Sequence, residues 1–152
     1  MLKQHAIAAL QAHLQAELRA VEAIAAAARD ETTSDETRQE GKYDTRAIEA
    51  SYLARGQAER VAALRQLVSW FSVLQPSECA QVQVGALVQL ERLGWLFVAP
   101  VGGHRVQVEG VALRMVSPSA PLGQAIADLE EGDVAEIEGP RGAQHLEVLQ
   151  VR

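Results

Sequence analysis

The segment DETTSDETRQEGKYD, residues 30–44, separates two long stretches of helical character. It contains six carboxylates but only two basic side chains. Apolar residues on both sides of it recur at steps of three and four, which is the spacing of one helix face. Two helices of similar length joined by a connection of this kind pack antiparallel. The sequence therefore predicts a helical hairpin with an acidic tip at residues 30–44.

The two helical stretches each carry a narrow apolar stripe. The first helix is expected over about residues 3–29, where Ala and Leu are abundant and Gly and Pro are absent. The second ends before Pro76, because proline cannot donate the helical hydrogen bond. The stripes consist of Ile7, Leu10, Leu14, Val21, Ile24 and Ala28 and then of Ile48, Tyr52, Val61, Leu64, Val68, Phe71 and Leu74. A narrow stripe with Glu17 at one seam position suits a coiled-coil hairpin over residues 1–75, with an ordinary helical bundle as the alternative.

Two interpretations of the tip are open. Thr33 and Thr37 each precede a glutamate by three residues, a capping box that could start the second helix, and Asp44 is a later candidate N-cap. In that case the acids are solvated and are stabilised by the helix dipole. Alternatively, the tip delivers carboxylates to a hard cation, since Mg²⁺ binds one or two carboxylates and completes its shell with waters or phosphates.

The second half predicts a small domain of strands, residues 81–152, after a linker at residues 76–80. Strands are expected at residues 82–90, 95–101, and 106–116 with a break at Gly110, and then at 134–138 and 145–151 around a turn. Pro121 suits the first position of a short helix, with Ser119 or Ala120 as its cap. The predicted fold class is therefore α+β.

Charge and composition exclude several functions. The net charge is −6, and neither half is basic, which argues against direct binding of duplex DNA or of an anionic membrane. The single cysteine, Cys79, excludes an intrachain disulfide. Residues 1–5 have no apolar signal core, and the apolar run at residues 23–28 is too short to span a bilayer. We expect a cytoplasmic protein.

Catalytic patterns are missing from the sequence. Ser117 and Ser119 lack the Gly-x-Ser-x-Gly frame of a nucleophile elbow. His104 and His145 are far apart in the chain and have no cysteine nearby, and His5 and His13 are expected to be structural or surface residues. These residues therefore indicate no catalytic site of the chain's own.

Three C-terminal segments resemble motifs of the Gre family of bacterial transcription elongation factors. They are VSPSAPLGQAI at residues 116–126, EGDVAEI at 131–137 and HLEVLQV at 145–151. Residues 43–54 and 95–103 look like a divergent branch of Gre-related proteins. The resemblance implies a coiled-coil hairpin followed by an FKBP-like C-terminal domain.

The resemblance also implies a partner and a site. The C-terminal domain would dock on RNA polymerase at the rim of its secondary channel, through Ser117, Pro118, Ser119, Pro121 and Leu122. The hairpin would bring its tip to the Mg²⁺ of the polymerase active site, with indirect contact to nascent RNA and no cofactor of its own. The acids expected to share that metal are Asp35, Glu36 and Glu40.

The sequence departs from the family where the chemistry lies. Cleavage factors carry an Asp-x-x-Glu-Asn-like motif at the tip, and residues 30–44 contain no Asp-x-x-Glu. The tip could therefore stimulate cleavage of backtracked RNA, or occupy the channel and inhibit. A coiled-coil adaptor and a prolyl isomerase are further alternatives. The isomerase would need an apolar cleft with aromatic walls, but Trp95 and Phe97 are expected in the core.

Overall fold

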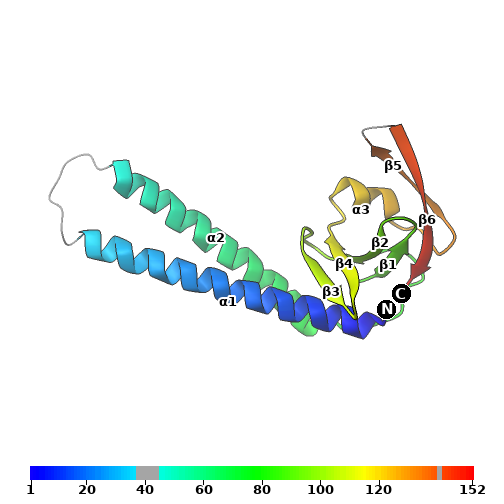
Figure 1. The fold of residues 1–152 in the computed structure, drawn as a ribbon, viewed down its shortest axis with the longest axis horizontal. Coiled ribbons are helices and arrows are strands. Elements are labelled where there is room, and N and C mark those ends of the chain that lie inside the picture. Colours follow the sequence, from blue (N-terminus) through cyan, green and yellow to red (C-terminus); the bar gives the residue numbers. More distant parts are fainter. Residues whose placement is uncertain (37–44, 140–141) are drawn as a thin grey trace. The chain divides into compact units, whose positions relative to one another are not determined.

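The described part of the chain contains two long helices, six strands and one short helix, which confirms the α+β class (Figure 1). The computed structural model describes residues 1–36, 45–139 and 142–152, and it leaves the side chains of residues 30–36, 45–47 and 50 undescribed. Packing divides the chain into two compact units. One contains Met1–Gln11 and Phe71–Arg152, and the other contains Ala12–Trp70.

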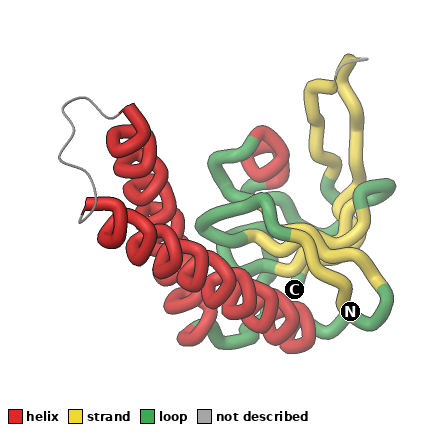
Figure 2. The backbone as a smooth tube through the Cα atoms, turned by 60° about the vertical axis from the view of Figure 1, so that its left-hand side comes forward, coloured by secondary structure: helices red, strands yellow, loops and turns green. Residues whose placement is uncertain are grey.

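The helices α1 (Lys3–Glu36) and α2 (Thr45–Val73) run antiparallel and form the predicted hairpin (Figures 1 and 2). Their 34 and 29 residues correspond to lengths of about 50 and 43 Å at about 1.5 Å per residue. Within the unit Ala12–Trp70, the buried apolar residues recur at helical spacing. They are Leu14 and Val21 from α1 and Val61, Leu64 and Leu67 from α2.

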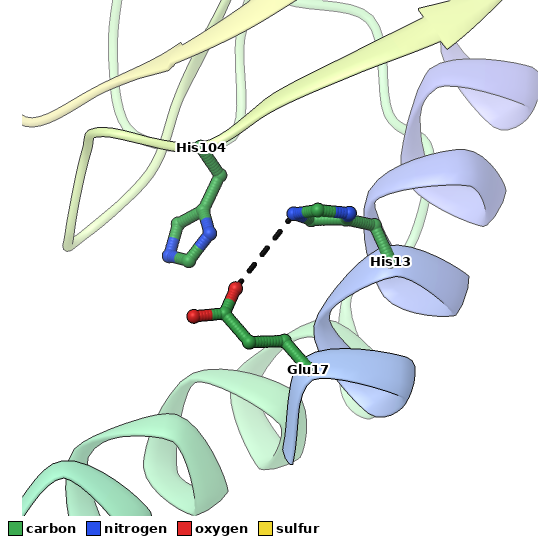
Figure 3. Close-up of side chains that lie close together, drawn as sticks. All are labelled: His13, Glu17 and His104. Carbon is green, nitrogen blue, oxygen red and sulfur yellow. Dashed lines mark ion pairs between the residues drawn. The ribbon is translucent and has the colours of Figure 1, made fainter. Parts of the chain in front are cut away.

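Ion pairs border this apolar seam. Arg60 of α2 donates to Glu17 of α1 at 2.9 Å, and Arg65 donates to Glu22 at 2.6 Å. Glu17 also lies 3.7 Å from His13 one turn earlier, a pair that is charged when His13 is protonated (Figure 3). The seam position of Glu17 is thus satisfied by a cation from the facing helix.

The far end of the hairpin differs from the expected pattern. Ile24, Ile48 and Tyr52 belong to the predicted stripes but are 55%, 59% and 72% exposed. After Ile24, the sequence of α1 contains no further large apolar residue, so α2 has no apolar partner there. Thr33 lies inside α1, so its capping box does not start the second helix, and Asp44 lies outside the described residues.

The six strands form one sheet. They are β1 (Leu87–Leu90), β2 (Gly94–Val98), β3 (Arg105–Val108), β4 (Val111–Val116), β5 (Val134–Gly139) and β6 (Gly142–Val151). Their order is β3-β4-β2-β1-β6-β5 (Figure 1). The pair β2–β4 is parallel and the other pairs are antiparallel.

Turn geometry sets two of the strand boundaries. The strand expected from residue 82 begins only at Leu87, because Gly85 adopts a φ of 92° in a turn before it. The break expected at Gly110 is a tight turn between β3 and β4. Glu109 and Gly110 both have positive φ there, 53° and 80°, as a two-residue turn of type I′ requires.

The core of the sheet unit is apolar and continuous. Its fully buried members include Leu96, Val88, Val148 and Ile126. Phe71, from the last turn of α2, packs on Phe97 of β2 with ring centroids 5.7 Å apart and is 1% exposed. The end of α2 is thereby part of the sheet unit.

The start of α1 is also tied to the sheet unit, whereas the sequence placed residues 1–75 together in the hairpin. Lys3 Nζ donates to the carbonyls of Ser77 and Arg152 at 2.5 and 2.9 Å and lies 3.2 Å from Cys79 Sγ. His5 Nδ1 lies 2.6 Å from Glu109 Oε1 in the β3–β4 turn. These partners are far apart in sequence, so no local pattern predicts them. In the part of the chain that is described, no helix has the length and apolarity of a membrane span.

Candidate functional site

The predicted docking segment is a loop that holds its own shape. It runs from Ser117 to Ala120 between β4 and the helix α3 (Pro121–Ile126). The backbone N–H of Ser119 donates to Ser117 Oγ at 3.2 Å, and the two serine hydroxyls are 2.7 Å apart. The N–H of Ala120 donates to the carbonyl of Ser117 at 3.0 Å. These local bonds fix the turn before any partner arrives.

The helix α3 begins as the sequence predicts. Ala120, and not Ser119, is the N-cap, with extended backbone angles of −73° and 150°, and Pro121 follows at the start of the helix. The cap makes no side-chain hydrogen bond. Instead Gln124 donates twice, from its backbone to the Ala120 carbonyl at 2.9 Å and from Nε2 to the Ser119 carbonyl at 3.3 Å.

Two glycines allow the loop to lie this close to its neighbours. A Cβ added at Gly123 would lie 2.0 Å from the carbonyl oxygen of Ser117, and one added at Gly102 would lie 2.8 Å from the Ser117 nitrogen. The backbone of Ser117 is therefore clamped between two positions that admit no side chain. We call Gly102, Ser117 and Gly123 the glycine clamp. In the sequence, this close packing is indicated only by Gly123, a glycine inside the predicted short helix.

The surface of this loop is suited to binding a partner and not to catalysis. Pro118, Ser119 and Pro121 are exposed, while Ser117 and Leu122 are half-buried. Leu122 packs against the buried core of the sheet unit, so it anchors the segment. The hydroxyls of Ser117 and Ser119 are engaged with one another. A rigid, uncharged surface of this type offers shape to a partner.

The predicted tip acids cannot be assembled into a site from the described residues. Asp35 and Glu36 belong to the last turn of α1, with undescribed side chains, and Glu40 lies outside the described residues. Their role toward Mg²⁺ stays a prediction.

Other residues singled out in the sequence have structural partners. His5 pairs with Glu109 and His13 with Glu17. Trp95 and Phe97 are 8% and 0% exposed, so these two aromatic side chains belong to the core and do not line an open cleft.

A family model matches the C-terminal third of the chain. Residues 101–152 match "Transcription elongation factor, GreA/GreB, C-term". The matched region contains β3 to β6, α3, the docking loop and all three members of the glycine clamp. No curated protein matches the chain.

Several solved structures are similar to the chain at low identity. GreA factor homolog 1 of Thermus thermophilus is 17% identical, over 93% of this chain and 94% of that one, with a TM-score of 0.41. Its Thermus aquaticus counterpart is 20% identical, over 92% of each chain, with a TM-score of 0.39. A GreA/GreB elongation factor from Nitrosomonas europaea is 16% identical, over 68% of this chain and 91% of that one, with a TM-score of 0.35.

Proposed function

We propose that this chain, a divergent Gre-family protein, is an elongation regulator that binds RNA polymerase at its secondary channel. The observation that carries the proposal is the family match over residues 101–152, which includes the loop Ser117–Ala120 and the start of α3 at Pro121 and Leu122. That loop is fixed by its own hydrogen bonds and by the glycine clamp. A surface that is already ordered loses little conformational freedom on binding, which favours affinity.

The helical hairpin supports the second part of the proposal. Two antiparallel helices of about 40–50 Å give the tip the length to reach into a deep channel. Mg²⁺ usually takes only one or two protein carboxylates and keeps other positions for waters and phosphates. Asp35, Glu36 and Glu40 would therefore complete a metal shell that the polymerase provides.

The chemistry itself would belong to the polymerase. A bound metal activates water and, in a pair, stabilises both the attacking and the leaving oxygen of a phosphodiester. In this proposal the tip supports the second metal during cleavage of backtracked RNA, contacts nascent RNA indirectly, and acts in the cytoplasm. The factor contributes carboxylates and position, and it makes no covalent step.

One observation favours a second candidate, a channel inhibitor without cleavage activity. The tip has no Asp-x-x-Glu between residues 30 and 44, so its acids are spaced differently from those of cleavage factors. Acids that reach the metal with the wrong spacing would block substrate entry without positioning a nucleophilic water.

Binding and chemistry are tested separately. Purified protein is expected to bind core RNA polymerase and to be displaced by a known secondary-channel factor. Ser119→Arg, in the exposed part of the loop, should weaken binding, whereas Gln107→Arg on exposed β3 is the matched control. Equal binding by both variants would count against docking through the loop, and no binding by wild type would refute the proposal.

Stalled, backtracked complexes then distinguish the two candidates. Loss of cleavage with Asp35→Ala, Glu36→Ala or Glu40→Ala supports the cleavage factor. Slower elongation without cleavage, relieved by the same variants, supports the inhibitor. Binding with no effect on either reaction contradicts both.

A further inference from the structure

The strand β5 forms one edge of the sheet, and the helix α3 packs close to it. This strand stands at the end of the strand order and, within the described residues, it pairs with β6 and with no other strand. In Figure 2 the β5–β6 hairpin extends away from the other strands of the sheet. An edge strand presents a row of backbone N–H and C=O groups that can pair with another chain.

Side chains alternate along this edge. Ala135 is buried and Ile137 is half-buried, whereas Val134, Glu136 and Glu138 are exposed on the other face. Val134 is an apolar residue that is 56% exposed at the start of the strand. A strand added beside β5 would therefore meet two carboxylates on its outer face and apolar side chains on its inner face.

The edge continues a strongly acidic run. Residues 128–138 contain six acids and no base, namely Asp128, Glu130, Glu131, Asp133, Glu136 and Glu138. All six are exposed. Among the described residues, none of these carboxylates has a basic side chain within ion-pair distance. The described part of this edge is therefore negatively charged, with His145 of β6 opposite Glu136.

The negative charge of this edge determines which kind of chain can pair with β5. Two copies of β5 paired edge to edge would bring the Glu136 and Glu138 carboxylates of both strands together, and like charges across strands are destabilising. The same field repels nucleic acid and anionic lipid. A basic strand gains instead, because opposite charges on neighbouring strands stabilise the pair.

We propose that the free edge of β5 binds an extended, basic segment of a partner protein by strand addition. Lysine or arginine at alternate positions of that segment faces Glu136 and Glu138, and the residues between them lie on the side of Ala135 and Ile137. Backbone hydrogen bonds supply the affinity and the alternating charges fix register and direction. The proposal uses neither the hairpin tip nor the docking loop, so it stands independently of the proposed function.

The test uses the isotope-labelled full chain and a short synthetic peptide with lysine at alternate positions and valine between them. The amide resonances of β5 should shift on titration. The charge reversal E136K/E138K should weaken binding by about tenfold or more, since two attractive pairs become repulsive. The matched control E49K/E59K reverses two exposed acids of α2 and should bind as wild type does.

A second peptide keeps the same charges but carries N-methyl groups on alternate backbone nitrogens. It cannot donate to the edge and should not bind, and this measurement uses the wild-type protein, so it does not depend on the folding of any variant. Equal binding of both peptides would mean charge attraction alone and would overturn strand addition. Absence of binding by the unmodified peptide would also overturn strand addition. It would mean that the acidic residues prevent other strands from pairing with this edge.

Discussion

Replacing Gly123 by alanine tests the glycine clamp directly. The new Cβ would lie 2.0 Å from the Ser117 oxygen, 2.8 Å from its carbonyl carbon and 3.0 Å from the Cα of Pro118. All three are backbone atoms, so no change of rotamer relieves the overlap. Even the tightest ordinary contacts begin at 3.0 to 3.4 Å, so α3 or the loop must move by an ångström or more.

Two energies compete in this variant. Alanine favours helix over glycine by about 1 kcal/mol, whereas overpacking of a close contact costs about 1–3 kcal/mol and sometimes more. An overlap this deep with backbone places the cost at the upper end, so we expect a net loss of about 2 kcal/mol. For a chain of this size, that lowers the melting temperature by about 4–8 °C.

Gly56→Ala is the matched control for the helix term. Gly56 lies in α2 with nothing within 4 Å of an added Cβ, so alanine should raise stability there by up to about 1 kcal/mol. Thermal and urea unfolding, followed by circular dichroism and tryptophan fluorescence, measure both variants. If Gly123→Ala were as stable as Gly56→Ala, the clamp would be refuted.

Three further variants test the packing. Phe71→Ala removes a side chain that is 1% exposed and packs on Phe97, so it should lower the free energy of unfolding by about 3–5 kcal/mol, as measured by urea unfolding. A loss below about 1 kcal/mol would contradict the core position of Phe71. Lys3→Met removes the hydrogen bonds to the carbonyls of Ser77 and Arg152 and should lower the free energy of unfolding by about 1–3 kcal/mol, whereas Arg92→Met on the surface should change it little. Equal losses would mean that these hydrogen bonds of Lys3 do not stabilise the fold. Arg60→Ala should cost only about 0.2–1 kcal/mol, and high salt should abolish the difference from wild type; a loss that persists in salt would mean that packing, not charge, dominates.

Local patterns predicted the elements of this fold but not their distant contacts. The break at Gly110, the start of α3 at Pro121 and the antiparallel helices follow from turn chemistry, the fixed φ of proline and apolar spacing. Those signals act over a few residues. The ties from Lys3 to Ser77 and Arg152 span most of the chain, so no window of sequence contains them.

Periodicity also overstated burial in the hairpin. Ile48 and Tyr52 continue the apolar stripe of α2 but stay exposed, because burial needs a partner and α1 provides no large apolar residue at that level. At the candidate site, the docking segment could be located from its sequence motif. The glycine clamp could not, since it depends on the approach of three separate backbone segments.

The place of β6 in the sheet has a consequence for synthesis. β6 lies between β1 and β5, and Val151 pairs with Val88, while Leu87 and Arg152 exchange two backbone hydrogen bonds. On the ribosome, β1 emerges before β6 and keeps one open edge until β6 has left the exit tunnel. A nascent chain that stalls before β6 carries an incomplete sheet in which β1 pairs with β2 on one side only, and such an open edge invites aggregation. The sheet therefore closes only after translation of β6, however early the helices form.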